Sequence, residues 1–353
     1  MTYQSKYHLS LLAAALATLP AGSAFACATC GCSLSSDAAM GYSSSAGWSA
    51  TLQYDFIDQN QLRTGASALR AAQVAAINNA GGSQEVEGVT TNHYVTAAIG
   101  YAPNADWNFK FMLPHIDRVH STYGQASNPL SASDLSGASV KGIGDAKLIA
   151  SFQGFLPTHN LGVQLGLKLP TGAYGGPNAS ASGTIGRNPA VFNSGPNAAQ
   201  ATPDNLLDTS LNAGTGSTDL IVGSYYYQAI SQNFDGFVNA QFQTAISHKL
   251  NQTGADFKPG ASANLSLGLR YQVNPNFVPQ LQLNIAHKRS DQGVLADTAD
   301  SAGTVAYLSP GFTAYMGDAS QVYAFLQLPV YSRLQGYQLF PHWTASVGIS
   351  HSF

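Results

Sequence analysis

Charge is the first property that this sequence has little of. Asp, Glu, Lys and Arg make up 9% of the 353 residues, whereas an ordinary soluble domain carries about 25%. The formal net charge of −3 indicates neither a basic surface for nucleic acid nor an acidic tail. Long apolar runs are scarce as well, because no stretch beyond the first 26 residues could form a transmembrane helix.

Hydrophobic residues nevertheless account for 44% of the chain, and the mean hydropathy is near zero. Gly, Asn, Gln, Ser and Thr supply most of the polar groups. A transmembrane β-barrel has this balance, because alternate residues of each strand face lipid and a wet lumen.

Cysteine is almost absent, and the three that occur lie together in the stretch CATCGC as Cys27, Cys30 and Cys32. The residues before them, 1–26, have the layout of a signal peptide: Lys6 near the start, the apolar core LSLLAAALATLP, and small residues up to Ala26. We expect cleavage after Ala26 and export of the chain, with a cysteine-containing periplasmic segment at 27–46.

Alternation of apolar and polar residues is the dominant pattern of the remaining chain. In ASANLSLGLRYQV (261–273) every odd position is apolar, and LGVQLGLKL, FVPQLQLNIAHK and HWTASVGISHSF alternate in the same way. Successive side chains of a strand point to opposite faces, so each segment has one apolar and one polar face. About twelve such strands are expected, near 47–57, 90–102, 106–118, 144–155, 160–170, 218–230, 234–248, 260–273, 277–289, 304–316, 321–332 and 340–353.

Tight turns and longer links alternate between these strands, which is typical of an outer-membrane barrel with both termini in the periplasm. The sequence therefore predicts an all-β fold: a transmembrane antiparallel β-barrel over 47–353, with a long outer loop at 171–217. A soluble β-sandwich also alternates, but its strands are usually five or six residues long, and its water-facing side carries more charge.

Aromatic residues and the chain end agree with a membrane barrel. The terminal Phe353 resembles the signal read by the outer-membrane assembly machinery, and lipids with lipopolysaccharide are the expected surroundings. Rings at headgroup level would form two belts, an outer one with Tyr54, Phe56, Tyr307, Tyr331 and Trp343, and a periplasmic one with Tyr101, Trp107, Phe152, Tyr271 and Phe277.

Two stretches resemble a known family. GIGDAKLIASF (142–152) has Gly144-Asp145 at the head of a strand, and LGLKLPTGAYG (165–175) leaves its strand through Leu-Pro-Thr-Gly. These stretches resemble outer-membrane channels associated with the meta-cleavage pathway of phenol degradation. The resemblance implies an outer-membrane channel or transporter, and the cysteine segment departs from the family's pattern.

A barrel of about twelve strands predicts a narrow lumen. Basic groups outnumber acidic ones among the residues expected to face it, which favours polar or anionic solutes; alternatively, these charges pair across the lumen and only rigidify it. Arg118, Lys249, Lys288, Arg289 and Arg333 are expected near lipid phosphates. The expected pore-lining residues are Asp55, Lys110, Asp145, Lys147, Lys168, Arg270, Gln282 and Lys288.

The loop at 171–217 has few large apolar residues, so little burial is available to order it. We expect a mobile outer lid rather than an inward constriction. Histidines near the outer strand ends could form a metal-collecting ring, but simple tolerance of His at the headgroup boundary is the preferred explanation.

The three cysteines leave several alternatives open. They could form one disulfide with one remaining thiol or bind Cu or Zn; acylation of Cys27 is a third alternative, although Phe25 is bulky for a lipidation signal. No Gly-x-Ser-x-Gly motif or paired-carboxylate site indicates an enzyme. The sequence predicts a channel for small solutes, such as aromatic or other small organic molecules, that needs no cofactor. A metal-handling barrel or a scaffold for a periplasmic redox partner is the alternative.

Overall fold

The computed structural model describes residues 46–178, 183–200, 205–272 and 274–353. The expected signal peptide with Ala26, and the three cysteines Cys27, Cys30 and Cys32, lie outside the described residues. All statements below concern the described part of the chain.

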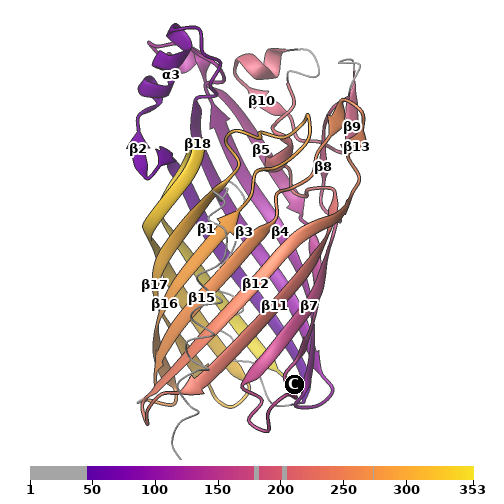
Figure 1. Cartoon of the computed structure of the whole chain (residues 1–353), viewed down its shortest axis with the longest axis vertical. Helices are drawn as coiled ribbons and strands as arrows, with labels where there is room; N and C mark the ends of the chain where they lie inside the picture. The colour runs from indigo at the N-terminus through magenta and orange to yellow at the C-terminus, as the bar shows by residue number, and fades with distance from the viewer. Residues whose placement is uncertain (1–45, 179–182, 201–204, 273) are drawn as a thin grey trace, which may run out of the picture.

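The chain forms a closed antiparallel β-barrel, tall and with tilted strands (Figure 1). Each strand pairs antiparallel with its neighbours, and pairing of β4 with β6 closes the ring. The predicted all-β barrel is therefore confirmed. Its wall consists of β1 (Gly47–Gly65), β3 (Glu87–Ala102), β4 (Trp107–Thr122), β5 (Ser136–Ile143), β6 (Ala146–Phe152), β7 (Leu161–Leu169), β11 (Ser217–Ala229), β12 (Phe234–His248), β15 (Ser262–Tyr271), β16 (Phe277–Lys288), β17 (Gly303–Met316) and β18 (Ser320–Ser352).

The element β18 contributes twice to the wall, because it folds back on itself. Residues 320–334 pair with β17, and residues 334–352 pair with β1. Its two ends meet where the amide of Ser352 donates to the carbonyl of Ala319 at 2.8 Å, and Gly336 at the bend has a φ of +60°. Two predicted strands are thus one continuous hairpin, and the number of wall strands agrees approximately with the expected twelve.

The strands β5 and β6 share one position beside β4, interrupted at Gly144 and Asp145. The sequence placed β5 within an outer link at 119–143, so that prediction was wrong. Above the interruption, the free edge of β5 pairs not with β7 but with β10 (Phe192–Ser194), a short strand from the long loop. The upper wall here is completed by a segment that comes from far along the chain.

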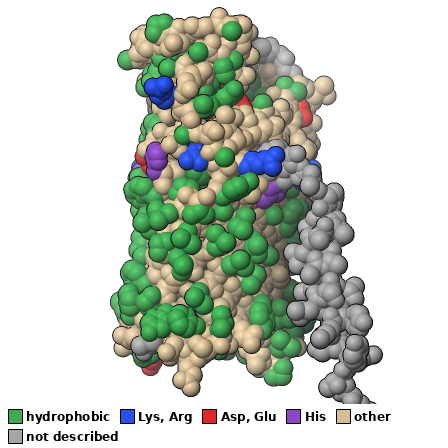
Figure 2. Space-filling model, turned by 60° about the vertical axis from the view of Figure 1, so that its left-hand side comes forward, with side chains coloured by type: hydrophobic (Ala, Val, Ile, Leu, Met, Phe, Trp, Pro, Cys, Tyr) green, Lys and Arg blue, Asp and Glu red, His purple; other side chains and the backbone are tan. Residues whose placement is uncertain are grey.

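The two faces of the wall differ as the alternation predicts. Leu165 is 60% exposed on the outside of β7, whereas its neighbour Gln164 is buried on the inside. Figure 2 shows the outward apolar side chains as a broad belt, with Lys, Arg and His in a band directly above it. An apolar surface of this extent is unfavourable in water and suits the hydrocarbon layer of a membrane.

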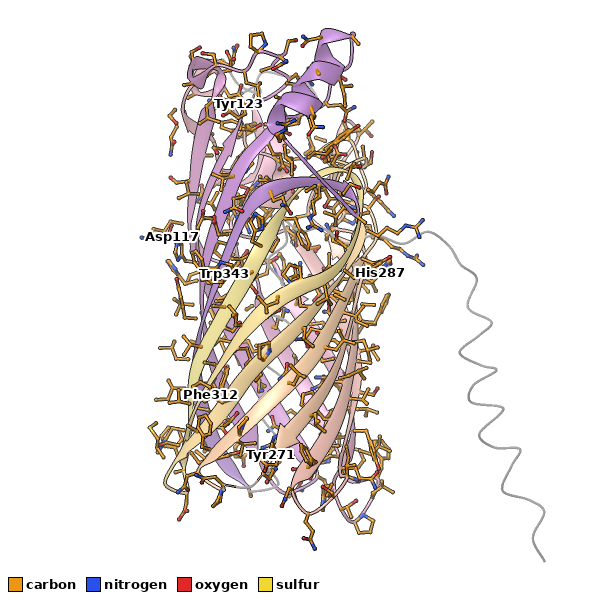
Figure 3. The ribbon with its side chains drawn as sticks, turned by 90° about the vertical axis from the view of Figure 1, so that its left-hand side faces the viewer. Asp117, Tyr123, Tyr271, His287, Phe312 and Trp343 are labelled. Carbon is orange, nitrogen blue, oxygen red and sulfur yellow. The ribbon has the colours of Figure 1, made fainter. Side chains whose placement is uncertain are left out.

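Aromatic side chains edge this belt (Figure 3). At its upper edge Phe56 packs against Trp343 with ring centroids 5.4 Å apart, and at its lower edge Phe277 packs against Phe312 at 5.1 Å. The prediction that Tyr307 belongs to the outer belt was wrong, because its side chain is buried in the interior and stacks on Phe340 with ring centroids 6.1 Å apart.

The upper end of the barrel extends well beyond the belt. The strand β1 continues to Gly65, turns into β2 (Ser67–Leu69) and leads to the helix α3 (Ala71–Asn79). A cluster of Leu62, Val74, Ala75, Val86 and Leu339 holds this helix on the rim. The sequence predicted only an outer link here. No helix among the described residues is long and apolar enough to cross a membrane.

The long segment between β7 and β11 is structured. It contains β8 (Tyr174–Pro177), β9 (Thr184–Arg187), β10, and two 3₁₀ turns, η3 (Pro196–Ala199) and η4 (Thr209–Leu211). Smaller elements elsewhere on the upper end are η2 (Ala132–Asp134), β13 (Asn251–Gln252) and β14 (Ala255–Asp256).

Candidate functional site in the barrel lumen

Part of the 171–217 loop enters the lumen. Phe192, Leu207, Leu211 and Ala213 are buried together with side chains from the inner face of the wall. We call this set the plug cluster; its wall members are Ile57, Tyr94, Ile116, Ala138 and Val140. The expectation of an outer lid was therefore wrong, because these few large apolar residues find an apolar inner surface on β1, β3, β4 and β5 and gain their burial there.

Arg118 on β4 fixes this segment. Arg118 is 3% exposed, and its guanidinium donates to the carbonyl oxygens of Leu211 and Asn212. The remaining donors reach Asn92 Oδ1 at 2.6 Å and the Tyr94 hydroxyl at 2.7 Å. The expectation that Arg118 meets lipid phosphates was wrong, because its position in the strand alternation turns it toward the interior. The planar guanidinium has several donors in fixed directions, so it can bind one backbone segment and two side chains at the same time.

The other end of η4 is held by Asp208, whose carboxylate accepts from the Ser210 amide at 3.0 Å. Burial raises the pKa of Asp208 to about 7, and the charges of Glu85, Asp297 and Asp291 add to this shift, while the Ser210 hydrogen bond opposes it. The segment is thus capped by an acid that is half protonated near neutral pH.

A second group of carboxylates lies at the upper rim. Asp300 accepts from the Tyr337 amide at 2.9 Å, and burial followed by the charge of Asp297 raises its pKa to about 6. Burial also raises the pKa of Glu85, which accepts from the Thr122 hydroxyl at 2.8 Å. Each of these acids has its own hydrogen-bond donor. The described residues contain no group of three or more His, Cys, Asp or Glu that could hold a metal ion.

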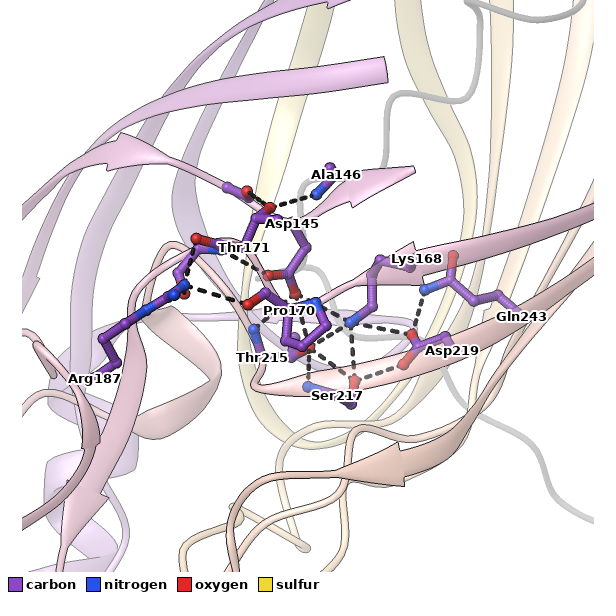
Figure 4. A network of polar contacts seen from close by, with 12 residues as sticks. Asp145, Ala146, Lys168, Pro170, Thr171, Arg187, Thr215, Ser217, Asp219 and Gln243 are labelled. Atoms are coloured by element: carbon purple, nitrogen blue, oxygen red, sulfur yellow. Dashed lines mark hydrogen bonds and ion pairs between the residues drawn. The ribbon is translucent and has the colours of Figure 1, made fainter. Parts of the chain in front are cut away.

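A buried ion network lies where the loop leaves the wall (Figure 4). Lys168 Nζ lies 3.1 Å from Asp145 Oδ2 and 3.2 Å from Asp219 Oδ2, and all three side chains are nearly inaccessible. Asp219 also accepts from Gln243 at 2.6 Å and from Ser217 at 2.5 Å. Two carboxylates share one ammonium, and surrounding donors satisfy the excess negative charge, as buried ions require.

The same network joins the two stretches that carry the family resemblance. Asp145 accepts from the amides of Gly172 at 3.1 Å and Thr215 at 2.9 Å. The Thr171 hydroxyl donates to the Gly144 carbonyl at 2.7 Å and accepts from the Ala146 amide at 2.8 Å. The Gly-Asp break and the Leu-Pro-Thr-Gly exit therefore form one joint, which Arg187 covers by donating to the carbonyls of residues 170–172.

The eight expected pore-lining residues are spread around the wall. Asp145 and Lys168 meet in the network, and Lys147 is the strand partner of Lys168. Asp55 accepts from Gln53 and Ser346. The other four lie apart: Lys110 on β4, Arg270 donating to the Tyr315 hydroxyl at 3.1 Å, Gln282 bonded to Asn284 at 3.4 Å, and Lys288 paired with Asp291 at 2.7 Å.

These pairs change the expected electrostatics of the lumen. Lys168 and Lys288 are compensated by carboxylates, and Asp219 and Asp291 were not among the expected lining residues. Lys288 is also buried, at the top of β16, which excludes the expected contact with lipid phosphate. The excess of basic groups that favoured anionic solutes is thus reduced by pairing.

Sequence reasoning missed Arg118 as an interior residue, together with Asp208, Asp219, Phe192, Leu207 and Leu211. The alternation around Arg118 carried the signal, because Ile116, Arg118 and His120 have the same parity on one strand and face inward together. The stretch LLDTSL (206–211) also contained a signal for the buried turn, because an Asp before Thr-Ser between leucines is typical of a capped turn with an apolar side.

Comparison with known proteins places the fold. The chain matches no protein-family model and no curated protein. Its structure is similar to that of an outer-membrane channel from Pseudomonas putida F1, with 13% identity, a TM-score of 0.58, and coverage of 87% of this chain and 96% of that one. The monoaromatic hydrocarbon channel CymD follows with 12% identity, a TM-score of 0.42, and 87% and 89% coverage. The β-domain of the Bordetella autotransporter BrkA has 11% identity, a TM-score of 0.44, and 88% and 100% coverage. The chain therefore shares its barrel fold with the channel from Pseudomonas putida F1.

Proposed function

We propose that the protein is an outer-membrane channel for small organic solutes. The observation that carries the proposal is the division of the wall: an apolar belt covers the outside, while amides, hydroxyls and paired charges line the inside. A polar lumen within a lipid-facing shell provides a path across the hydrocarbon layer.

The plug cluster is the selective element of this proposal. It sets an apolar surface formed by Phe192, Leu207 and Leu211 across part of an otherwise polar passage. Solutes with an apolar part, aromatic molecules among them, would replace contacts that the plug cluster makes with the wall, whereas inorganic ions would gain nothing there. This chemistry favours organic solutes over salts.

Liposome swelling with the mature protein tests the proposal. Small organic solutes should enter faster than ions of similar size. Leu211→Ala should increase the entry of both, since it removes buried contacts from the plug cluster. The outward substitution Leu165→Ala is the matched control and should leave entry unchanged. Absence of flux for the wild type and for Leu211→Ala would contradict the proposal.

The remaining expectations belong to the same proposal. Cleavage after Ala26 would release a mature chain with both ends in the periplasm, and Phe353, exposed at the lower end, would be read by the assembly machinery. Lipopolysaccharide would surround the upper half. A link to phenol degradation is supported by the resemblance of residues 142–175 and is tested by comparing phenol uptake in cells with and without the protein.

The cluster of Cys27, Cys30 and Cys32 supports a second proposal, in which these thiols bind Cu or Zn or contact a periplasmic redox partner. Three soft sulfur ligands within six residues suit Cu(I). Reduced mature protein should bind about one Cu(I), and Cys30→Ser with Cys32→Ser should abolish that binding. A disulfide in the isolated protein would contradict the metal site.

A further inference from the structure

The inner face of β16 carries a row of three amides at alternate positions: Gln280, Gln282 and Asn284. Their side chains are buried, with exposed fractions of 5%, 0% and 0%. Alternate residues of a strand lie on one face about 6.6 Å apart, so the three amides form a line along the lumen wall.

Each amide is paired at one end only. Gln280 Nε2 donates to Thr313 Oγ1 at 2.7 Å, and Asn284 Nδ2 donates to Ser309 Oγ at 2.9 Å and to Gln282 Oε1 at 3.4 Å. Among the described residues no partner reaches Gln280 Oε1, Gln282 Nε2 or Asn284 Oδ1. Buried polar atoms are paired in more than about 90% of cases, so these three atoms need partners that the chain does not supply, either buried water or a bound solute.

The kind of atom left unpaired alternates along the row. Asn284 Nδ2 donates to Gln282 Oε1. Gln282 therefore has an unpaired donor, Nε2, and Asn284 has an unpaired acceptor, Oδ1. Exchanging nitrogen and oxygen in both amides gives the same result, since the remaining atoms are again one donor and one acceptor. A binding partner must therefore both accept and donate at neighbouring points.

Two phenyl rings flank the row. Phe237 from β12 lies over Gly268, the strand partner of Gln282, and Phe325 from β18 lies over Gly311, the strand partner of Gln280. A β-carbon at either glycine would collide with the ring. The glycines thus allow the rings to lie against the wall on both sides of the amides, where they provide apolar contact for a carbon skeleton.

Two cations lie near this face. Arg270, with its Nε unpaired among the described residues, is the strand partner of both Gln280 and Asp235. Lys288, higher on the same strand, is paired with Asp291. A carboxylate solute could satisfy donors only and would leave the acceptors of Gln280 and Asn284 unpaired, so the face suits an uncharged solute.

We infer that the inner face of β16 is a binding site for an uncharged solute with hydroxyl groups on adjacent carbons, a vicinal diol. One hydroxyl oxygen accepts from one amide of the Gln282–Asn284 pair, the other hydroxyl donates to the second amide, and the carbon skeleton contacts Phe237 and Phe325. This site rests on the proposed channel and names the class of solute that it selects.

Equilibrium binding to the full mature protein in detergent tests the site. Probes on one skeleton are cyclohexane-1,2-diol, cyclohexanol and cyclohexanecarboxylate. The diol should bind more tightly than the alcohol and the carboxylate, by roughly tenfold for one net hydrogen bond. Gln282→Leu should remove that preference, while Gln241→Leu, an inward amide on β12, should retain it.

The thermal transition of each variant separates loss of binding from misfolding. The diol should raise the transition temperature of the wild type by mass action and leave that of Gln282→Leu unchanged, while both proteins unfold cooperatively. Should Gln282→Leu not fold, Asn284→Ser, which keeps a hydroxyl but shortens the reach, should weaken diol binding in the same way.

The outcomes distinguish this inference from the proposed channel. Swelling assays that show solute flux, with equal binding of the three probes or no binding of the diol, would overturn the site and leave the channel intact; only water would then fill the row. Selective diol binding to a barrel without flux would uphold the site and overturn the channel.

Discussion

Arg118 and Leu211 are 93 residues apart in the chain, yet the guanidinium of the first donates to the backbone carbonyl of the second inside the barrel. This contact connects the wall to the inserted segment at a point where η4 ends. Because a carbonyl at the end of a turn has no partner within the turn, the arginine supplies the bond that keeps η4 inside the lumen.

Replacing Arg118 should release the plug cluster. Hydrogen bonds to charged groups contribute about 1.5–3 kcal/mol, so Arg118→Ala should raise the time-averaged conductance in planar bilayers at least tenfold. Arg118→Lys should open the channel partially, since an ammonium lacks the planar fork. Lys141→Gln, which removes an exposed cation at the same height on β5, should leave conductance unchanged.

A single substitution in the Lys168 network should destabilise the barrel more than a matched double substitution. Lys168→Met leaves two buried carboxylates without their cation and should destabilise the barrel by about 3–5 kcal/mol. Adding Asp219→Leu removes one of these carboxylates and should restore much of the loss. Thermal unfolding in detergent measures both; equal stability of the single and double variants would contradict the shared role of Lys168.

Conductance should depend on pH through Asp208. The pKa of its carboxyl rises from 3.8 to about 7 when the segment is packed, so the packed state binds the proton more tightly than the released state. The stabilisation of the packed segment by this proton is largest below about pH 4 and is lost as the pH rises through 7. Conductance should therefore increase between about pH 4 and 7.

Asp208→Asn should abolish this pH dependence while preserving the turn, because Asn is an equally good N-cap. Asp318→Asn, in the exposed turn at the lower end, is the control and should retain the wild-type profile. An unchanged profile in Asp208→Asn would show that another group titrates.

The two faces of β12 should respond oppositely to charge. Phe242 is exposed on the apolar belt, whereas its neighbour Gln241 faces the lumen. Phe242→Arg should cost about 2–4 kcal/mol if it lies near the membrane midplane, and Gln241→Arg should cost much less. Folding titrations into lipid vesicles measure this difference, and similar costs would indicate that the belt does not meet lipid.

The barrel could be predicted from sequence because its signal is local. Alternation in segments such as 161–169 and 340–352 assigns each side chain to a face without knowledge of its neighbours. The strand near Phe234 to His248 was placed correctly for the same reason. Glycine-containing segments gave weaker signals: SGASVKGI alternates too weakly to stand out, and β5 was taken for a link.

The interior could not be predicted in this way, because its contacts join residues distant in sequence. Nothing local to Arg118 identifies Leu211 as its partner, and the low polarity contrast of the 171–217 segment suggested disorder. Its few leucines become significant only once a barrel provides an apolar inner surface at Ile57 and Ile116. Lys168 follows the strand alternation and is buried, but its second carboxylate, Asp219, depends on pairing between β7 and β11.

The pairing of β1 with β18 has a consequence for biogenesis. The Thr51 and Ser350 hydroxyls, 299 residues apart, lie 3.0 Å from each other across this seam. A ribosome therefore releases the first strand long before its partner exists, and an unpaired strand edge invites association with other chains. Contacts of such high sequence separation also fold slowly. Without residues 334–352 the sheet would stay open, with one edge of β1 and one edge of the first half of β18 left unpaired.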